Sequence, residues 1–385
     1  MSVAIVFHQF GPYHHSRVRA LQNVVADVIP VQVAEASRTY AWTRNADTVE
    51  DIVSLTQGAE EDAGFLQVFT AAYRLWKQKQ VKIVFLPSYF PATSLALLLS
   101  AKCAGVKCIM MNESHAGTER ATGIKRVAKK FLISLFDAAI LGGMPHLRHF
   151  ESLGMKPDQM TTGYDAIDNS YFTKNAHLAR ANKDETRARM GLPKRYLLSL
   201  GRMVEKKNLT LLIEAYAKVK TMVPETDLKL VFVGSGDCQD TLIQQCKNLE
   251  LSYTQQPMED GENDVIFYGF RQIDENPSFY ALAEAFVLPS MYEEWGLVVN
   301  EAMACGLPIL VSNTVGSAED LVIDGLNGFQ FSPESADDLA EKIIQLEKNP
   351  ELRLRMGTAS EERISHWGCE NFAEKAKKIL GKVIK

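Results

Sequence analysis

Short apolar runs alternate with longer amphipathic stretches along most of the chain. The runs at 3–7 and 82–86 are rich in β-branched residues and end near glycine or proline, which is typical of buried parallel strands. Between them, positions 62–79 carry apolar residues at i, i+3 and i+4 spacing, which predicts a helix. Repeated strand–helix units predict a parallel sheet that is covered on both faces. The first half therefore indicates an α/β domain.

The same pattern restarts in the second half, with strands expected at 196–200 and 228–234. The polar stretch at 174–189 holds few large apolar residues, and we interpret it as the connector between two domains. A chain of 385 residues is also too long for one ordinary core. We predict an α/β fold with Rossmann-like domains at 1–175 and 190–366. Because ligands bind beyond the carboxyl ends of parallel strands, we expect a cleft between two facing sheets.

Composition narrows the class of protein. Hydrophobic residues make up 46% and charged residues 23%, the balance of a soluble globular protein. The net charge of −5 argues against nucleic acid as a partner. The six cysteines form no Cys-x-x-Cys pair, so we predict reduced thiols, no metal site and a cytoplasmic protein. No basic leader opens the sequence, and no apolar stretch is long enough to span a bilayer.

The most informative segment lies at 289–308, where a predicted strand leads through a glycine turn into a short apolar helix. Exposed amides at the start of that helix would bind an anion such as a diphosphate. Glu301 lies one turn inside the helix among apolar neighbours, where ribose hydroxyls would satisfy its carboxylate. Glu293 in the preceding loop would reach a sugar beyond the phosphates. The alternative is two solvated glutamates on an ordinary turn. The amides in question are those of Gly296, Leu297 and Val298.

Two cations form the second informative segment. Arg202 follows a predicted strand and Lys207 precedes a predicted helix, so both can point to the same edge of the sheet. Fixed cations of this kind stabilise a leaving nucleoside diphosphate as negative charge develops on it. The alternative is a solvated charged face.

These segments together resemble the retaining glycosyltransferases of family 4, which have the GT-B fold. The string from Glu293 to Glu301, continuing as Ala-Met-Ala-Cys-Gly-x-Pro, is similar to the glutamate-pair signature of that family. A Gly-Arg-x-x-x-x-Lys motif brings Arg202 and Lys207 into register, with Lys206 as a solvent-facing neighbour. Two positions depart from the family pattern, because Glu294 and Asn208 stand where glycine is usual. The departure at 294 bears on which donor sugar is accepted.

The resemblance extends to weaker segments. It implies that the domain at 190–366 binds the nucleotide sugar and that the domain at 1–175, completed by a helix in 367–385, binds the acceptor. His115 matches a family histidine near the donor sugar, although a histidine that caps the next turn is an equal alternative. Further nucleotide-binding candidates are Gly201, Gly234 and Phe270. The acceptor-side candidates are Gly11, Tyr13, His14 and Asp165.

A basic amphipathic helix is predicted around Lys125–Lys130, with Val127, Phe131 and Leu132 as its apolar residues. Such a helix would touch anionic lipid headgroups, giving peripheral contact with the inner face of a membrane. The alternative is an ordinary helix that covers the sheet and keeps its charged face in solvent.

The resemblance implies a retaining hexosyltransferase of polysaccharide or glycoconjugate biosynthesis. The donor would be a UDP-sugar or, as an alternative, a GDP-sugar, and the acceptor a carbohydrate, a lipid-linked intermediate or a small molecule. We expect no cofactor and no metal, because the sequence has no Asp-x-Asp motif and the cations serve the diphosphate. The competing hypotheses are a sugar-nucleotide epimerase or phosphorylase on the same fold, and a non-catalytic nucleotide-sugar-binding subunit.

Overall fold

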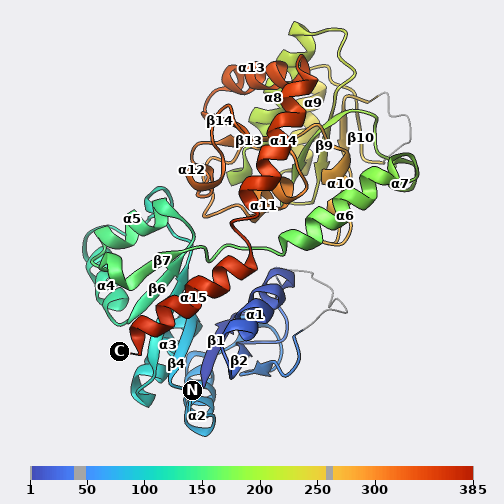
Figure 1. Cartoon of the computed structure of the whole chain (residues 1–385). Helices are drawn as coiled ribbons and strands as arrows, with labels where there is room; N and C mark the ends of the chain where they lie inside the picture. Colours follow the sequence, from blue (N-terminus) through green and yellow to red (C-terminus); the bar gives the residue numbers. More distant parts are fainter. Residues whose placement is uncertain (1, 39–48, 257–262, 385) are drawn as a thin grey trace. The chain divides into compact units, whose positions relative to one another are not determined.

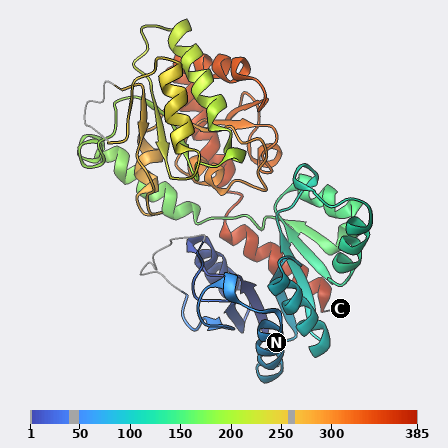
Figure 2. The ribbon, with the colours of Figure 1, turned by 180° about the vertical axis from the view of Figure 1, so that it is seen from behind.

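The computed structural model describes residues 2–38, 49–256 and 263–384. The chain falls into two compact units, the first Met1–Asp168 with Trp367–Lys385 and the second Asn169–His366 (Figure 1). Each unit is a seven-stranded, all-parallel sheet with helices packed on it, and Figure 2 shows the same arrangement from behind. The predicted α/β class with two Rossmann-like domains is confirmed.

The first unit has the strand order β3-β2-β1-β4-β5-β6-β7. Its strands are β1 (Val3–Phe7), β2 (Val28–Gln32), β3 (Val53–Ser54), β4 (Ile83–Pro87), β5 (Lys107–Asn112), β6 (Ala138–Leu141) and β7 (Met160–Thr162). Its α-helices are α1 (Pro12–Val24), α2 (Phe65–Gln78), α3 (Ala92–Ala104), α4 (Gly123–Ser134), α5 (Met144–Ser152) and α15 (Cys369–Val383). Short 3₁₀ turns are η1 (Glu60–Asp62), η2 (Ala116–Thr118) and η3 (Pro157–Gln159).

The second unit has the strand order β10-β11-β9-β8-β12-β13-β14. Its strands are β8 (Tyr196–Leu200), β9 (Lys229–Val233), β10 (Tyr253–Thr254), β11 (Val265–Phe267), β12 (Ala285–Leu288), β13 (Ile309–Ser312) and β14 (Gly328–Phe331). Its helices are α6 (Asn169–Ala181), α7 (Lys183–Met190), α8 (Leu209–Met222), α9 (Gln239–Asn248), α10 (Asn276–Leu282), α11 (Leu297–Ala304), α12 (Ala318–Leu321), α13 (Ala336–Glu347) and α14 (Pro350–Ile364), with a 3₁₀ turn η4 (Glu205–Lys207).

Both faces of the central strands are buried, which explains their unbroken apolar runs. In β1, Ala4 and Val6 join a core on one side of the sheet, whereas Val3 and Ile5 join a second core on the other side. The first core includes residues of α2 and α3, and the second includes residues of α1 and α15. The last helix of the chain therefore belongs to the core of the first unit.

The polar stretch at 174–189 is not the connector that its composition suggested. It forms most of α6 and α7, both inside the second unit. Phe172, Ala176 and Ala179 are buried along one side of α6, so a stripe of mostly small residues is enough to dock this helix. Arg180 fixes the same helix by donating from Nε to the carbonyl of Ala281 at 2.9 Å.

The strand order reverses direction at one point in each sheet, between β1 and β4 and between β8 and β12. Loops that follow the strands on either side of such a switch point diverge and leave a crevice that binds ligands. In the second unit these loops are the ones that begin at Gly201 and at Pro289, which carry the motifs singled out above.

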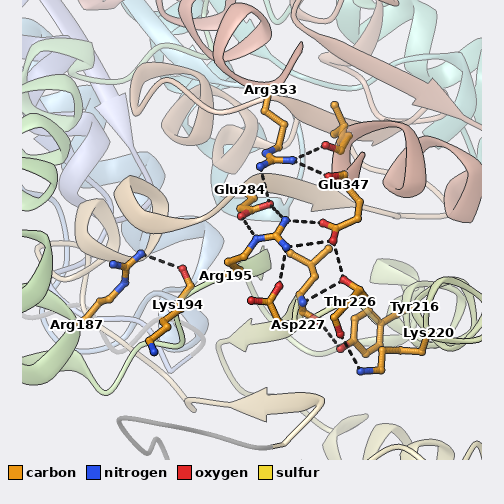
Figure 3. Close-up of polar contacts among 12 residues, drawn as sticks. Arg187, Lys194, Arg195, Tyr216, Lys220, Thr226, Asp227, Glu284, Glu347 and Arg353 are labelled. Carbon is orange, nitrogen blue, oxygen red and sulfur yellow. Dashed lines mark hydrogen bonds and ion pairs between the residues drawn. The ribbon is translucent and has the colours of Figure 1, made fainter. Parts of the chain in front are cut away.

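The opposite, amino edge of the second sheet carries a network of ion pairs (Figure 3). Arg195, directly before β8, donates from Nε and one terminal nitrogen to Glu284 at 2.6 and 2.9 Å. It also donates to Glu347 at 2.7 and 3.2 Å and to Asp227 at 2.6 Å. Arg353 reaches the Glu284 carboxylate at 3.3 Å. The network ties the starts of β8 and β12 to α13 and α14.

Candidate functional site

Two glycine turns form the floor of the candidate site in the second unit. Gly201, at φ 144°, directly follows β8, and Gly234, at φ 134°, directly follows β9. A Cβ atom on Gly234 would lie 1.9 Å from the carbonyl oxygen of Gly201, so the two turns leave no room for a side chain at Gly234. The amide of Gly201 donates to the carbonyl of Val233 at 2.9 Å, which holds the turns together.

The turn η4 positions the lysines. Asn208 follows it at φ 51°, in the left-handed region, which glycine and asparagine adopt most readily. This conformation explains why asparagine can replace the glycine that is usual at this position. The amide of Met291 donates to the carbonyl of Lys206 at 2.9 Å and joins the turn to the loop after β12.

Glu293 meets both lysines of this turn. Its carboxylate accepts a hydrogen bond from Lys207, and its second oxygen lies 2.8 Å from Nζ of Lys206. Lys206 also contacts Glu294 at 3.0 Å, so the interpretation of Lys206 as a solvent-facing neighbour is wrong. Lys206 lies between the carboxylates of Glu293 and Glu294. The turn η4 directs the side chains of both of its lysines toward the loop after β12.

The charges of this cluster shift its pKa values. Burial raises the pKa of the Glu293 carboxyl, but Lys207 and Lys206 outweigh burial and hold that pKa below its usual value. Burial opposes the charged form of Lys206, yet its hydrogen bond to Glu293 keeps its pKa above the usual value. Both shifts favour the ionised forms of Glu293 and Lys206 at neutral pH.

Helix α11 starts beside this cluster. Gly296 precedes it at φ 93°, and a Cβ atom there would lie 3.2 Å from a methyl carbon of Leu288. The position thus requires glycine for its backbone conformation and for its packing. The amides of Leu297 and Val298 form the first turn of α11, where backbone donors have no partner within the helix. Trp295 is buried and donates from Nε1 to Asn300 at 2.9 Å.

Glu301 is fully buried in α11. Tyr280 donates its hydroxyl to a carboxylate oxygen of Glu301 at 2.9 Å, and the side-chain nitrogen of Asn276 lies 3.4 Å from the same oxygen. The sequence predicts a polar partner for this carboxylate but does not identify Tyr280. The signal was weak, because Tyr280 lies in a separate helix, α10.

A small pocket opens at the carboxyl edge of the second sheet, lined in part by Gly201, Arg202, Lys207 and Leu288. Phe270 lies in the loop after β11 and is 44% exposed. The residue before it accepts a hydrogen bond from the amide of Gly234 at 2.8 Å. The structure thus brings Gly201, Arg202, Lys207 and Glu293 together, and joins the turns that carry Gly234 and Phe270.

The candidates of the first unit take mainly structural positions. His115 is buried and caps η2, because its Nδ1 accepts a hydrogen bond from the amide of Gly117 at 3.2 Å. His14 likewise accepts from the amide of Gly11 at 2.9 Å and stacks on Phe7. Burial lowers the pKa of His14 well below the usual value, so this ring is neutral. Tyr13 is half-buried in the first turn of α1.

Asp165 is buried after β7, and Nη2 of Arg17 lies 3.9 Å from its carboxylate. Arg17 also donates to the carbonyl of Ala166 at 2.8 Å and lies over the ring of Tyr164. Burial raises the pKa of Asp165 to about 6, although the charge of Arg17 opposes this shift. Arg17 could not be identified from the sequence, because nothing local distinguishes it from a solvated helix arginine. In the described ranges, no group of three His, Cys, Asp or Glu side chains is placed to hold a metal ion.

Comparisons with known proteins identify the fold of the chain and relate its second unit to a family of enzymes. Residues 182–363 match the model of the family described as glycosyl transferases group 1. Two solved structures share the fold over nearly the whole chain. Sucrose-phosphate synthase from Thermosynechococcus elongatus has a TM-score of 0.76 at 17% identity, covering 100% of this chain and 99% of that chain. Anabaena HepE, solved in complex with UDP, has a TM-score of 0.72 at 16% identity, covering 99% and 100%. The chain therefore has the GT-B fold.

Among curated proteins, this chain is similar to N-acetyl-alpha-D-glucosaminyl L-malate synthase of Bacillus anthracis. The two are 28% identical over 249 residues, which cover 59% of this chain and 60% of the relative. The matches to the first relatives span between a third and two thirds of their length. These likenesses support a GT-B glycosyltransferase.

Proposed function

We propose that this protein is a retaining glycosyltransferase that moves a sugar from a nucleoside-diphosphate sugar to an acceptor hydroxyl, in polysaccharide or glycoconjugate biosynthesis. The observation that carries the proposal is the contact of Glu293 with Lys206 and Lys207 at the switch point of the second sheet. Helix α11 begins directly after the loop that carries Glu293. A switch point with cations, a helix start and a carboxylate suits a sugar diphosphate.

The reaction develops negative charge on the diphosphate as the glycosidic bond breaks. In our proposal Arg202, Lys207 and the first amides of α11 stabilise that charge. Glu293, which the lysines keep ionised, accepts a hydrogen bond from the donor sugar and stabilises positive charge near its anomeric carbon. The acceptor attacks from the face that the diphosphate leaves, and a phosphate oxygen takes the acceptor proton. This path retains the anomeric configuration.

We assign the remaining contacts with the donor nucleotide sugar from the positions of residues in the second unit. Glu301 would bind the ribose hydroxyls, after Tyr280 yields or shares its carboxylate oxygen. The turns at Gly201 and Gly234 would leave room for the nucleotide, and backbone groups near Phe270 would contact the base. We favour a UDP-sugar, because HepE was solved with UDP, and keep a GDP-sugar as the alternative. His115 stays a proposed catalytic residue that also caps its own turn.

The acceptor would be a carbohydrate, a lipid-linked intermediate or a small molecule, bound with the help of the first unit near Gly11, Tyr13, His14 and Asp165. The protein would work in the cytoplasm, with peripheral contact to the membrane through the helix at 125–130. Nucleic acid is not an expected partner at a net charge of −5.

No cofactor or metal takes part in this proposal, because side-chain cations serve the diphosphate. Transfer should therefore continue at an unchanged rate in the presence of EDTA. A complete loss of activity that Mg²⁺ restores would contradict this part of the proposal.

Nucleotide sugars themselves provide the test of function. In a thermal-shift panel, a true donor at ~100 Kd raises the unfolding free energy by about 2.7 kcal/mol. Release of the nucleoside diphosphate is then measured with and without acceptor. We expect release that depends on acceptor. Conversion of the sugar nucleotide without acceptor would indicate an epimerase, and binding without any release would indicate a non-catalytic subunit.

A further inference from the structure

Helix α4 presents three large apolar side chains to solvent. Ile124, Val127 and Phe131 are 88%, 67% and 65% exposed, whereas the buried residues of this helix are Lys129 and Ile133. A helix that only covers a sheet turns such a stripe inward. The alternative of an ordinary sheet-covering helix accounts for Ile133, which lies in the core of the first unit, but not for the contiguous exposed apolar stripe, which indicates an interaction surface.

A partly buried ion pair fixes this orientation. Nζ of Lys129 lies 2.8 Å from Glu119 and 3.2 Å from Nε2 of His149. Burial lowers the pKa of His149 to about 4, so its ring is neutral and accepts a hydrogen bond from the lysine. Turning α4 over to bury Phe131 would leave the partly buried Glu119 and the buried His149 without this cation, which is unfavourable away from solvent. The apolar stripe is thus held outward.

Cations flank the stripe on both sides. At 3.6 residues per turn, Ile124, Val127 and Phe131 fall within an arc of about 60°, and Lys125 and Lys130 project on opposite sides of it. Both lysines are exposed. The helix carries four basic residues and no acidic residue, in a chain whose net charge is −5. The surface formed by these five residues, here called the α4 surface, is apolar in the middle and positive at its borders.

We propose that the α4 surface docks on an anionic lipid bilayer. Its apolar residues enter the boundary between headgroups and acyl chains, and Lys125 and Lys130 pair with lipid phosphates. Charge favours this occupant over a second copy of the chain, because two α4 surfaces would bring like charges together. No helix of the described ranges is long and apolar enough to cross a membrane. The proposal specifies the membrane contact in our proposed function but does not depend on sugar transfer.

Vesicle sedimentation of the full chain tests the proposal without any nucleotide sugar. We expect binding to vesicles that contain phosphatidylglycerol and little binding to pure phosphatidylcholine. Lys125→Gln/Lys130→Gln should weaken binding by roughly 25-fold, because each surface lysine contributes about fivefold. Val127→Ser/Phe131→Ser should weaken it on the order of 100-fold. Leu66→Ser is the matched control, since Leu66 is 73% exposed on α2.

Several results would overturn the proposal. One is equal vesicle binding by the wild type and both double variants. Another is equal binding to neutral and anionic vesicles. A third is self-association that Val127→Ser/Phe131→Ser abolishes while vesicles are not bound, which would assign the surface to a second copy. The changed side chains are exposed, so thermal unfolding should be unaffected. If the serine variant fails to fold, the lysine variant alone decides. Failure here leaves the nucleotide-release result untouched.

Discussion

The second sheet carries one charged cluster at the amino ends of its strands, the amino edge, and another at their carboxyl ends, the carboxyl edge. The two clusters are built from different side chains and contacts. At the amino edge, Arg195 contacts Glu284, Glu347 and Asp227 through five hydrogen bonds. At the carboxyl edge, flexible lysines of η4 contact Glu293 and Glu294. Both clusters hold basic and acidic groups within hydrogen-bonding distance, so composition alone does not separate them.

Geometry separates them. The planar guanidinium of Arg195 matches two carboxylates in a bidentate manner, and it joins the starts of strands to helices. The lysine cluster lies instead among turns with positive-φ glycines, at a switch point and beside a helix start. We infer that the amino edge stabilises the fold and that the carboxyl edge carries the chemistry. The position of a charge relative to the strand end is therefore more informative than its neighbours in the sequence.

The largest expected effect is on turnover at the carboxyl edge. Lys207→Ala and Arg202→Ala should each lower kcat on the order of 10²–10³-fold, because each removes a donor aimed at developing charge. Melting temperatures should fall less than in Arg195→Met, because Lys206 still pairs with Glu293. The matched control is Lys218→Ala, since Lys218 pairs with Asp337 on the surface of the same unit. Near wild-type kinetics in both variants would contradict the proposal that Arg202 and Lys207 stabilise the leaving diphosphate.

The amino edge should respond in the opposite way. Arg195→Met leaves Glu284 and Glu347 without their main cation, and we expect a loss of roughly 2–4 kcal/mol in the free energy of unfolding. The value is below that for a fully buried pair because Arg195 is partly exposed. Urea denaturation measures it, and kcat of the folded enzyme at 25 °C should not change. A large drop in kcat with an unchanged urea midpoint would reverse the two assignments.

Substitutions of Glu293 and Glu301 distinguish two proposed roles within the carboxyl edge. Glu301→Gln should weaken binding of bare UDP by roughly 1.5–3 kcal/mol, the value of a charge-assisted hydrogen bond. Glu293→Gln should leave UDP affinity nearly unchanged and impair turnover, because its contact matters most in the transition state. Calorimetry and initial rates separate these effects. Wild-type transfer by Glu293→Gln/Glu294→Gln would mean that neither loop carboxylate contacts the reacting sugar.

The smallest expected effect concerns pH. The pKa of Glu293 is lower in the folded protein than in the unfolded chain, so its ion pairs stabilise the fold above the unfolded value of about 4.3. That contribution is lost as the pH falls through the folded pKa. The difference in unfolding free energy between the wild type and Glu293→Gln should therefore shrink from pH 6 to pH 3. A constant difference across this range would show that the lysines do not stabilise the ionised form.

Much of the fold could be predicted from the sequence, because strands buried on both faces leave apolar runs such as those of β1 and β8. Helix docking was harder to predict. The stripe of α6 consists mostly of alanines and looked like a linker, and the orientation of α4 depends on Lys129 meeting residues of other elements. The candidate site came from motif spacing, which indicated Arg202, Lys207 and the two glutamates. Two contacts could not be predicted, because they depend on tertiary structure. They are the hydrogen bond of Tyr280 to Glu301 and the ion pair of Lys206 with Glu294.

Titration of bare UDP by calorimetry tests the central claim most directly, because it needs no knowledge of sugar or acceptor. We predict that the wild type and Arg195→Met bind UDP with similar affinity at a temperature where both are folded. The variant Arg202→Ala/Lys207→Ala should be folded and should bind UDP at least tenfold more weakly. Equal binding by this variant and the wild type would contradict the assignment of the carboxyl edge to the nucleoside diphosphate.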